Sequence, residues 1–133
     1  MKLKHSLKPI GIATLIVSQA SNAMPLAFTD ATHTFNSTNE VRLILIDQLS
    51  ELEEQLSIGL PSSPDAAQVA FNHRLSSQMS AKIDNAHQDV VDAWSIGVAK
   101  VPAVVVDAKY VVYGDLNIER ALLKIRQYRK ARP

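Results

Sequence analysis

Short apolar runs separated by polar stretches open the chain beyond its first 23 residues. An apolar run at 26–28 is closed by Thr29-Asp30, and a longer run at 41–46 ends at Asp47. Such runs are typical of β-strands. Because the second run is apolar almost throughout, it predicts a strand covered on both faces, with helices on each side of the sheet. The polar residues 31–40 between the two runs predict a loop or a poorly formed helix.

Apolar spacings of three and four residues then predict helices. A short helix with three leucines on one face follows Asp47 and stops at Gly59, and a longer helical region leads from Pro64 to Gly97. The apolar row of the longer region is Phe71, Leu75, Met79, Ile83, Ala86, Val90 and Trp94. This region is long for one helix of a globular domain, so we expect a bend at 76–80.

The end of the chain predicts a β-hairpin followed by a helix. Val101-Pro102 leads into a β-branched run at 103–107, residues 107–109 turn the chain, and a second strand at 110–113 ends at Gly114. Asp115 or Asn117 can cap the final helix. The apolar face of that helix comprises Ile118, Ala121, Leu122, Ile125 and Tyr128. The order β, loop, β, helices, β, β, helix predicts an α/β domain.

The first 23 residues have the pattern of a cleavable signal peptide. Lys2, Lys4 and Lys8 form a basic region, residues 10–17 are apolar, and small residues surround Ala23. Cleavage after Ala23 would leave a single domain over 24–133 with no membrane segment, because the apolar stretch is too short to span a bilayer. An uncleaved membrane anchor is the alternative interpretation.

Composition excludes several kinds of chemistry. The chain has no cysteine, which excludes thiol redox catalysis and zinc sites built on thiolates. His33, His73 and His87 lack ligand-like spacing, so we expect neither metal nor cofactor. Without its three signal lysines the chain has 11 basic and 13 acidic residues, a net charge of −2, which argues against nucleic acid as a direct partner. The basic residues near the C-terminus are interpreted as residues at the end of a helix, where positive charge interacts favourably with the helix dipole.

The order of elements resembles the thioredoxin fold. That resemblance covers nearly the whole predicted domain and implies a mixed sheet of about four strands flanked by helices. It also implies a cis peptide bond at Val101-Pro102, beside the loop that carries Cys-x-x-Cys in thioredoxin-like enzymes. In this chain the corresponding stretch runs from Phe28 to Phe35 and contains neither thiol.

A second resemblance is more specific. The motifs that carry it are Phe28-Thr29-Asp30, Val90-Val91-Asp92-Ala93-Trp94, Val101-Pro102-Ala103-Val104-Val105-Val106-Asp107 and Tyr110-Val111-Val112-Tyr113-Gly114. Through them the chain is similar to an integrating conjugative element protein family with a domain of unknown function. The resemblance implies a periplasmic accessory of a type IV secretion apparatus in a Gram-negative cell, with other conjugative transfer proteins as partners. It implies no catalytic residue.

We expect a binding site around Val101 and Pro102. If their peptide bond is cis, the backbone of Val101 is not fully paired in the sheet and could pair with an extended peptide. Trp94 could supply an aromatic anchor. Two plainer interpretations stay open: Trp94 could be an ordinary core residue, and Val101-Pro102 could be a structural turn.

The loop residues Thr29, Asp30 and His33 are expected to form the neighbouring wall of that groove. Together with Thr32 they also suggest an enzyme with an acid/base or hydroxyl nucleophile, although such loops more often hold turn and cap residues. We therefore favour a non-enzymatic protein that binds a partner. A redox-inactive periplasmic chaperone with many clients is the alternative.

Overall fold

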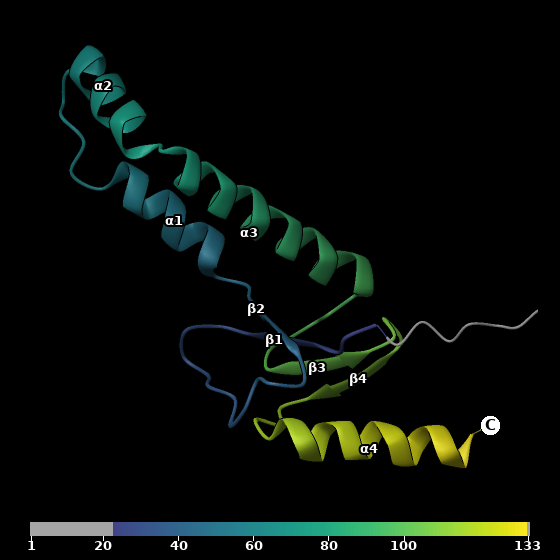
Figure 1. Ribbon diagram of the computed structural model, residues 1–133. Coiled ribbons are helices and arrows are strands. Elements are labelled where there is room, and N and C mark those ends of the chain that lie inside the picture. The colour runs from purple at the N-terminus through teal and green to yellow at the C-terminus, as the bar shows by residue number, and fades with distance from the viewer. Residues whose placement is uncertain (1–22, 133) are drawn as a thin grey trace, which may run out of the picture.

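The computed structural model describes residues 23–132, so the predicted signal peptide, apart from Ala23, lies outside the described residues. Four strands and four helices follow one another along the chain (Figure 1). In order they are β1 (Leu26–Thr29), β2 (Arg42–Leu45), α1 (Gln48–Ser57), α2 (Pro64–Arg74), α3 (Ser77–Ile96), β3 (Ala103–Val106), β4 (Tyr110–Tyr113) and α4 (Ile118–Ala131). The predicted α/β class is confirmed.

The four strands form one mixed sheet in the order β2-β1-β3-β4. β2 runs parallel to β1, whereas β3 is antiparallel to β1 and β4 is antiparallel to β3. Phe28 sits at the centre of this sheet, opposite Ile44 on one side and Ala103 on the other. The arrangement is compatible with a thioredoxin-like fold, and the predicted loop connects β1 to β2 without a helix.

Each face of the sheet carries its own apolar cluster, because successive side chains of a strand point to opposite faces. Phe28, Ile44, Ala103 and Val105 pack with Ala93 on the α3 side. On the α4 side lie Ala27, Phe35, Val41, Val104, Ile118, Ala121 and Leu122. Helices therefore cover both faces, as predicted, and Figure 1 shows the sheet between α3 and α4.

The prediction that the second strand is covered on both faces was wrong for β2. This strand forms an edge of the sheet, and Leu43 is 41% exposed. Within the apolar run at 41–46, only Val41 and Ile44 are buried. Arg42 crosses instead to α3, where its guanidinium pairs with Asp89 and lies 3.6 Å from Asp92.

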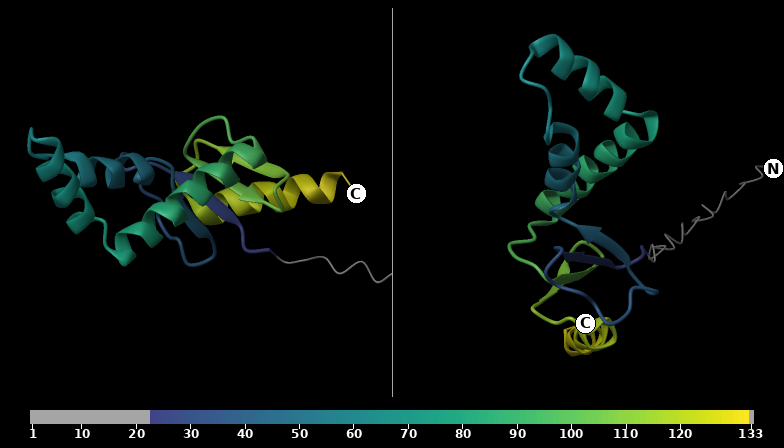
Figure 2. Two further views of the ribbon diagram at one scale, coloured as in Figure 1. Left: turned by 90° about the horizontal axis from the view of Figure 1, so that it is seen from above. Right: turned by 90° about the vertical axis from the view of Figure 1, so that its left-hand side faces the viewer.

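The helices α1, α2 and the N-terminal part of α3 project away from the sheet (Figures 1 and 2). α1 packs along α3 through the buried Leu52 and Leu56, whereas α2 buries no residue. The chain breaks at Leu75 between α2 and α3, and Ser76 caps α3 by accepting a hydrogen bond from the Met79 N–H at 3.2 Å. The predicted bend is thus confirmed at the first residue of its expected range. We call this projection, residues 48–85, the helical arm.

Gly97 ends α3 and turns the chain toward β3. Its φ is 78°, and its N–H donates to the carbonyls of Ala93 and Trp94, both at 3.1 Å. Glycine is favoured at a position with this left-handed backbone conformation, because a Cβ there adds strain. A Cβ at Gly97 would meet no atom within 4 Å, so the strain would be confined to the backbone.

Gly97→Ala is therefore expected to lower the free energy of unfolding by about 1 kcal/mol, measured by urea denaturation followed by circular dichroism. Gly97→Asn should lose about half as much, because asparagine tolerates left-handed backbone better than alanine. An asparagine variant as unstable as the alanine variant would show that the backbone conformation of Gly97 is not the source of the loss.

Candidate functional site

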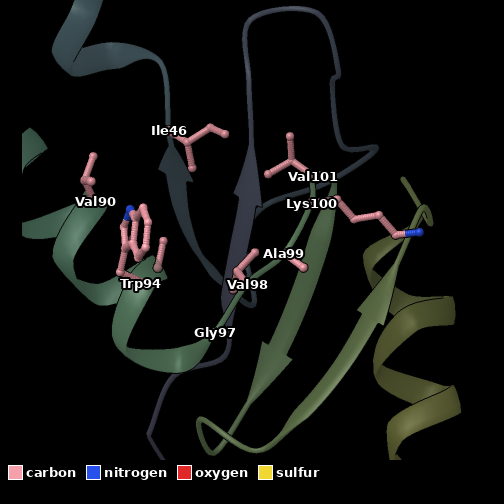
Figure 3. Close-up of a pocket in the computed structure, with 9 residues that line it drawn as sticks. Ile46, Val90, Trp94, Gly97, Val98, Ala99, Lys100 and Val101 are labelled. Carbon is pink, nitrogen blue, oxygen red and sulfur yellow. The ribbon is translucent and has the colours of Figure 1, made fainter.

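A groove of about 530 Å³ lies between the end of α3 and the segment that leads into β3 (Figure 3). The residues that line it are Ile46, Val90, Ala93, Trp94, Gly97, Val98, Ala99, Lys100 and Val101. All of these side chains except that of Lys100 lack a charge, and most are aliphatic. The groove therefore offers an apolar surface with one cation at its border.

Trp94 is the most exposed large apolar side chain of the groove. It is 82% exposed, and Figure 3 places its indole ring on the α3 side of the groove, one helical turn beyond Val90. The interpretation of Trp94 as a core residue was wrong. α3 buries the small Ala86 and Ala93, and the next residue along a helix is rotated by about 100° from Ala93. The buried stripe of α3 therefore passes beside Trp94.

Val101 and Pro102 stand where the chain enters the sheet. Their peptide bond is cis, as predicted, and Pro102 is buried with its carbonyl accepting the Gly114 N–H at 2.9 Å. Val101 is half-buried and lines the groove. Among the described residues, neither the N–H nor the C=O of Val101 forms a hydrogen bond.

Thr29, Asp30 and His33 reach the same end of the sheet but do not line the groove. Extending the register of β1 and β3 by two positions brings Asp30 opposite Val101. The Thr29 hydroxyl is buried and donates to the His33 carbonyl at 2.9 Å, which turns it into the loop. The neighbouring wall that we expected from Thr29, Asp30 and His33 is provided by Ile46, whose N–H donates to the Thr29 carbonyl at 3.0 Å.

The polar side chains of this loop bind one another. Asp30 accepts the Thr32 hydroxyl at 2.7 Å and the Thr32 N–H at 3.0 Å, and its Oδ1 lies 2.7 Å from His33 Nδ1. The hydrogen bonds from Thr32 and His33 lower the pKa of Asp30 to about 2. Asp47 adds an anchor by accepting the Ala31 N–H at 2.8 Å. These contacts fix a turn.

The loop geometry differs from that of a hydrolytic triad. A triad histidine uses one ring nitrogen for the nucleophile and the other for the carboxylate. Here the Thr32 hydroxyl and Asp30 both contact Nδ1 of His33, at 2.9 and 2.7 Å, and the hydroxyl also donates to Asp30. This pattern matches a set of turn residues, the alternative that the sequence left open.

Of the groove residues, sequence reasoning named only Trp94 and Val101, and it missed Ile46, Val90, Ala93, Gly97, Val98, Ala99 and Lys100. Ile46 comes directly after a predicted strand, so its position at the end of the sheet could have been inferred, but its approach to α3 depends on tertiary packing. In the described part of the chain, no group of three or more histidine or carboxylate side chains could hold a metal ion. None of the helices between residues 23 and 132 combines the length and apolar character needed to cross a bilayer.

Comparison with known proteins identifies the family without naming an activity. Residues 22–131 match the model of a family described as a protein of unknown function (DUF1525). No curated protein and no solved structure matches the chain. Because the match spans nearly all of the described residues, the chain belongs to the DUF1525 family.

Proposed function

We propose that this protein is a non-enzymatic periplasmic accessory of a conjugative type IV secretion apparatus, and that it binds an extended segment of a partner protein in the groove. The observation that carries the binding role is that the exposed Trp94 and the unpaired backbone of Val101 belong to the same groove. An exposed tryptophan in an apolar groove is unfavourable in water unless another surface covers it.

The two features serve different parts of one binding mode. The N–H and C=O of Val101 can hydrogen-bond to the main chain of an extended peptide, which gives affinity without reading its sequence. The indole of Trp94 and the aliphatic side chains of Val90 and Ile46 can then hold an apolar side chain of that peptide. Aromatic anchors in such positions contribute much of the binding energy of an interface.

The cellular setting rests on the sequence. The basic, apolar and small-residue regions before Met24 support export, and the family match begins at residue 22, next to the predicted cleavage site. The absence of cysteine is compatible with a periplasmic location but is not an argument for it. The conjugative role rests on a resemblance to integrating conjugative element proteins. Two of the motifs that carry this resemblance are Val90-Val91-Asp92-Ala93-Trp94 and the segment that begins at Val101-Pro102.

A donor strain that lacks the gene tests this proposal when it is complemented with variants at equal periplasmic abundance. Trp94→Ala is expected to lower the mating frequency about tenfold or more, because the anchor is lost. It should change the free energy of unfolding by less than about 0.5 kcal/mol, because the side chain is exposed. Val91→Ala is the matched control: Val91 is also exposed on α3 but lies outside the groove, so mating should stay at the wild-type level.

Further variants separate the alternatives. Val101→Asp should impair mating like Trp94→Ala, whereas His33→Ala should not. A lower mating frequency with His33→Ala alone would favour a catalytic activity of the loop. Equal decreases in mating frequency with Val91→Ala and Trp94→Ala would exclude the groove as the binding site. If deletion leaves the mating frequency unchanged, the conjugative role is wrong. Periplasmic pull-downs that return many unrelated proteins would then favour a chaperone.

A further inference from the structure

The outer side of β4 is an open edge of the sheet. β4 is the last strand in the order, and no described segment pairs with its outer side. The Gly114 N–H donates to the Pro102 carbonyl at 2.9 Å, which makes Pro102 and Gly114 a hydrogen-bonded pair. Such pairs alternate along antiparallel strands, so Val112 also bonds to β3, whereas Val111 and Tyr113 direct their N–H and C=O groups outward.

Two lysines bracket this open edge. Lys109 Nζ lies 5.4 Å from the centre of the Tyr110 ring, at the beginning of β4, and Lys100 Nζ lies 5.5 Å from the centre of the Tyr113 ring, at its end. Figure 3 shows the Lys100 side chain extending across from the segment before β3 toward the end of β4. Neither lysine forms an ion pair with any described residue.

The two carboxylates that flank β4 in the sequence already form ion pairs. Asp107 pairs with Arg129 at 3.0 Å, and Asp115 pairs with Arg120 and Lys124. Residues 100–132 contain eight basic and three acidic residues, a net charge of +5, whereas residues 23–99 contain three basic and ten acidic residues, a net charge of −7. An acidic segment would therefore be attracted to the β4 side of the molecule and repelled by the helical arm.

The positions of Tyr110 and Tyr113 would set the spacing of acidic residues in a segment that binds along β4. Tyr110 and Tyr113 are three residues apart and therefore point to opposite faces of the sheet. Tyr110 lies against Tyr128 of α4, with ring centres 6.2 Å apart, and Tyr113 packs with the cluster on the α3 side. A residue of an added strand points to the same face as the residue directly opposite. Carboxylates opposite Tyr110 and Tyr113 would thus reach Lys109 and Lys100.

We propose that the β4 edge binds an extended segment of a partner protein that carries two acidic residues three positions apart, acid-x-x-acid, with apolar residues around them. The backbone of Val111 and Tyr113 would pair with the segment, and the lysines would fix its register. A second copy of this chain does not fit, because antiparallel pairing of two β4 edges would place Lys109 of one copy near Lys100 of the other, and like charges repel. This site shares Lys100 with the groove, but it lies along a different strand edge and does not rest on the function proposed for the groove.

The test uses a synthetic eight-residue peptide of valine and threonine with glutamate at its third and sixth positions. The control peptide has glutamine at both positions. In amide hydrogen exchange, the glutamate peptide should slow exchange at Val111 and Tyr113 but leave Val112 nearly unchanged, because Val112 is already bonded to β3. At low salt, the control peptide should bind about tenfold more weakly. Lys109→Gln should raise the dissociation constant of the glutamate peptide about three- to fivefold, and Lys100→Gln should do the same.

The groove provides an internal control. Trp94 is the single tryptophan, so its fluorescence should stay unchanged when the peptide binds to β4, and Trp94→Ala should bind the peptide like wild type. Unchanged exchange at Val111 and Tyr113, or equal affinity for the glutamine peptide, would overturn the proposal. The proposal would also be overturned if the wild-type protein binds neither peptide and the double variant Lys100→Gln/Lys109→Gln forms dimers. The lysines would then serve only to keep the β4 edges of two copies from pairing.

Discussion

Phe28→Ala is expected to lower the free energy of unfolding by about 3–5 kcal/mol. Phe28 is fully buried, with 0% of its surface exposed, and lies in the central strand between Ile44 and Ala103. Its ring joins the sheet to α3 through Ala93, so truncation leaves a cavity that rigid neighbouring strands cannot close. The domain has no cysteine and hence no disulfide to compensate. Urea denaturation followed by circular dichroism measures the effect.

Leu123→Ala is the matched control, because Leu123 is exposed on α4 and should lose less than about 0.5 kcal/mol. Domains of this size are stable by about 5–15 kcal/mol in total, so the Phe28 alanine variant could be largely unfolded. Phe28→Leu then gives a measurable loss of about 1–1.5 kcal/mol. Equal losses for the Phe28 and Leu123 variants would contradict the placement of Phe28 at the centre of the core.

The elements that the sequence predicted well depend on local signals. The turn at Asp107 and Ala108 takes up positive φ values of 54° and 51°, and aspartate is one of the residues that tolerates such turns. Asn117 caps α4 by accepting the Arg120 N–H at 2.8 Å, one of the two caps expected. The two-sided sheet was expected from the apolar run at 41–46, whereas in the structure it is β3 that sends side chains to both apolar clusters.

The features that the sequence did not predict depend on which surfaces meet. Periodicity put Trp94 in the same row as Val90, but the row on α3 that contacts the sheet is set by how closely the small Ala93 lets the helix approach. The edge position of β2 likewise depends on the order of strands, so an apolar run could not show that Leu43 lies open. The position of Ile46 in the wall of the groove likewise depends on tertiary packing.

The separation of charge along the chain connects the two proposed sites. The acidic helical arm and the basic α4 lie on opposite sides of the sheet (Figure 1), and the groove and the β4 edge both lie at the sheet between them. Lys100 contributes to both, since it lines the groove and stands over the ring of Tyr113. A partner that occupies both sites would therefore have to present its acidic residues away from the arm.

Asp115→Asn is expected to lower the free energy of unfolding by about 2 kcal/mol at pH 7. Asp115 is only 5% exposed, yet its carboxylate accepts Arg120 Nη2 at 2.6 Å, Lys124 Nζ at 2.9 Å and the Asn117 N–H at 3.0 Å. The asparagine keeps the shape but loses the charge that strengthens these bonds. Because they tie the loop after β4 to the first turns of α4, the loss should affect the whole α4 side of the core.

The pH dependence distinguishes this charge effect from a packing defect. The hydrogen bond from Arg120, followed by that from Lys124, holds the pKa of Asp115 well below its usual range. A carboxyl whose pKa is lower in the folded state stabilises the fold above its unfolded pKa of about 4, and this contribution is lost as the pH falls below that value. The difference between wild type and Asp115→Asn should therefore be full at pH 7 and shrink at pH 3, whereas Asp30 titrates alike in both proteins and cancels. Asp107→Asn, which removes a more exposed pair with Arg129, should lose less than about 1 kcal/mol. A difference that stays constant from pH 7 to pH 3 would show that the carboxylate charge of Asp115 is not what stabilises the start of α4.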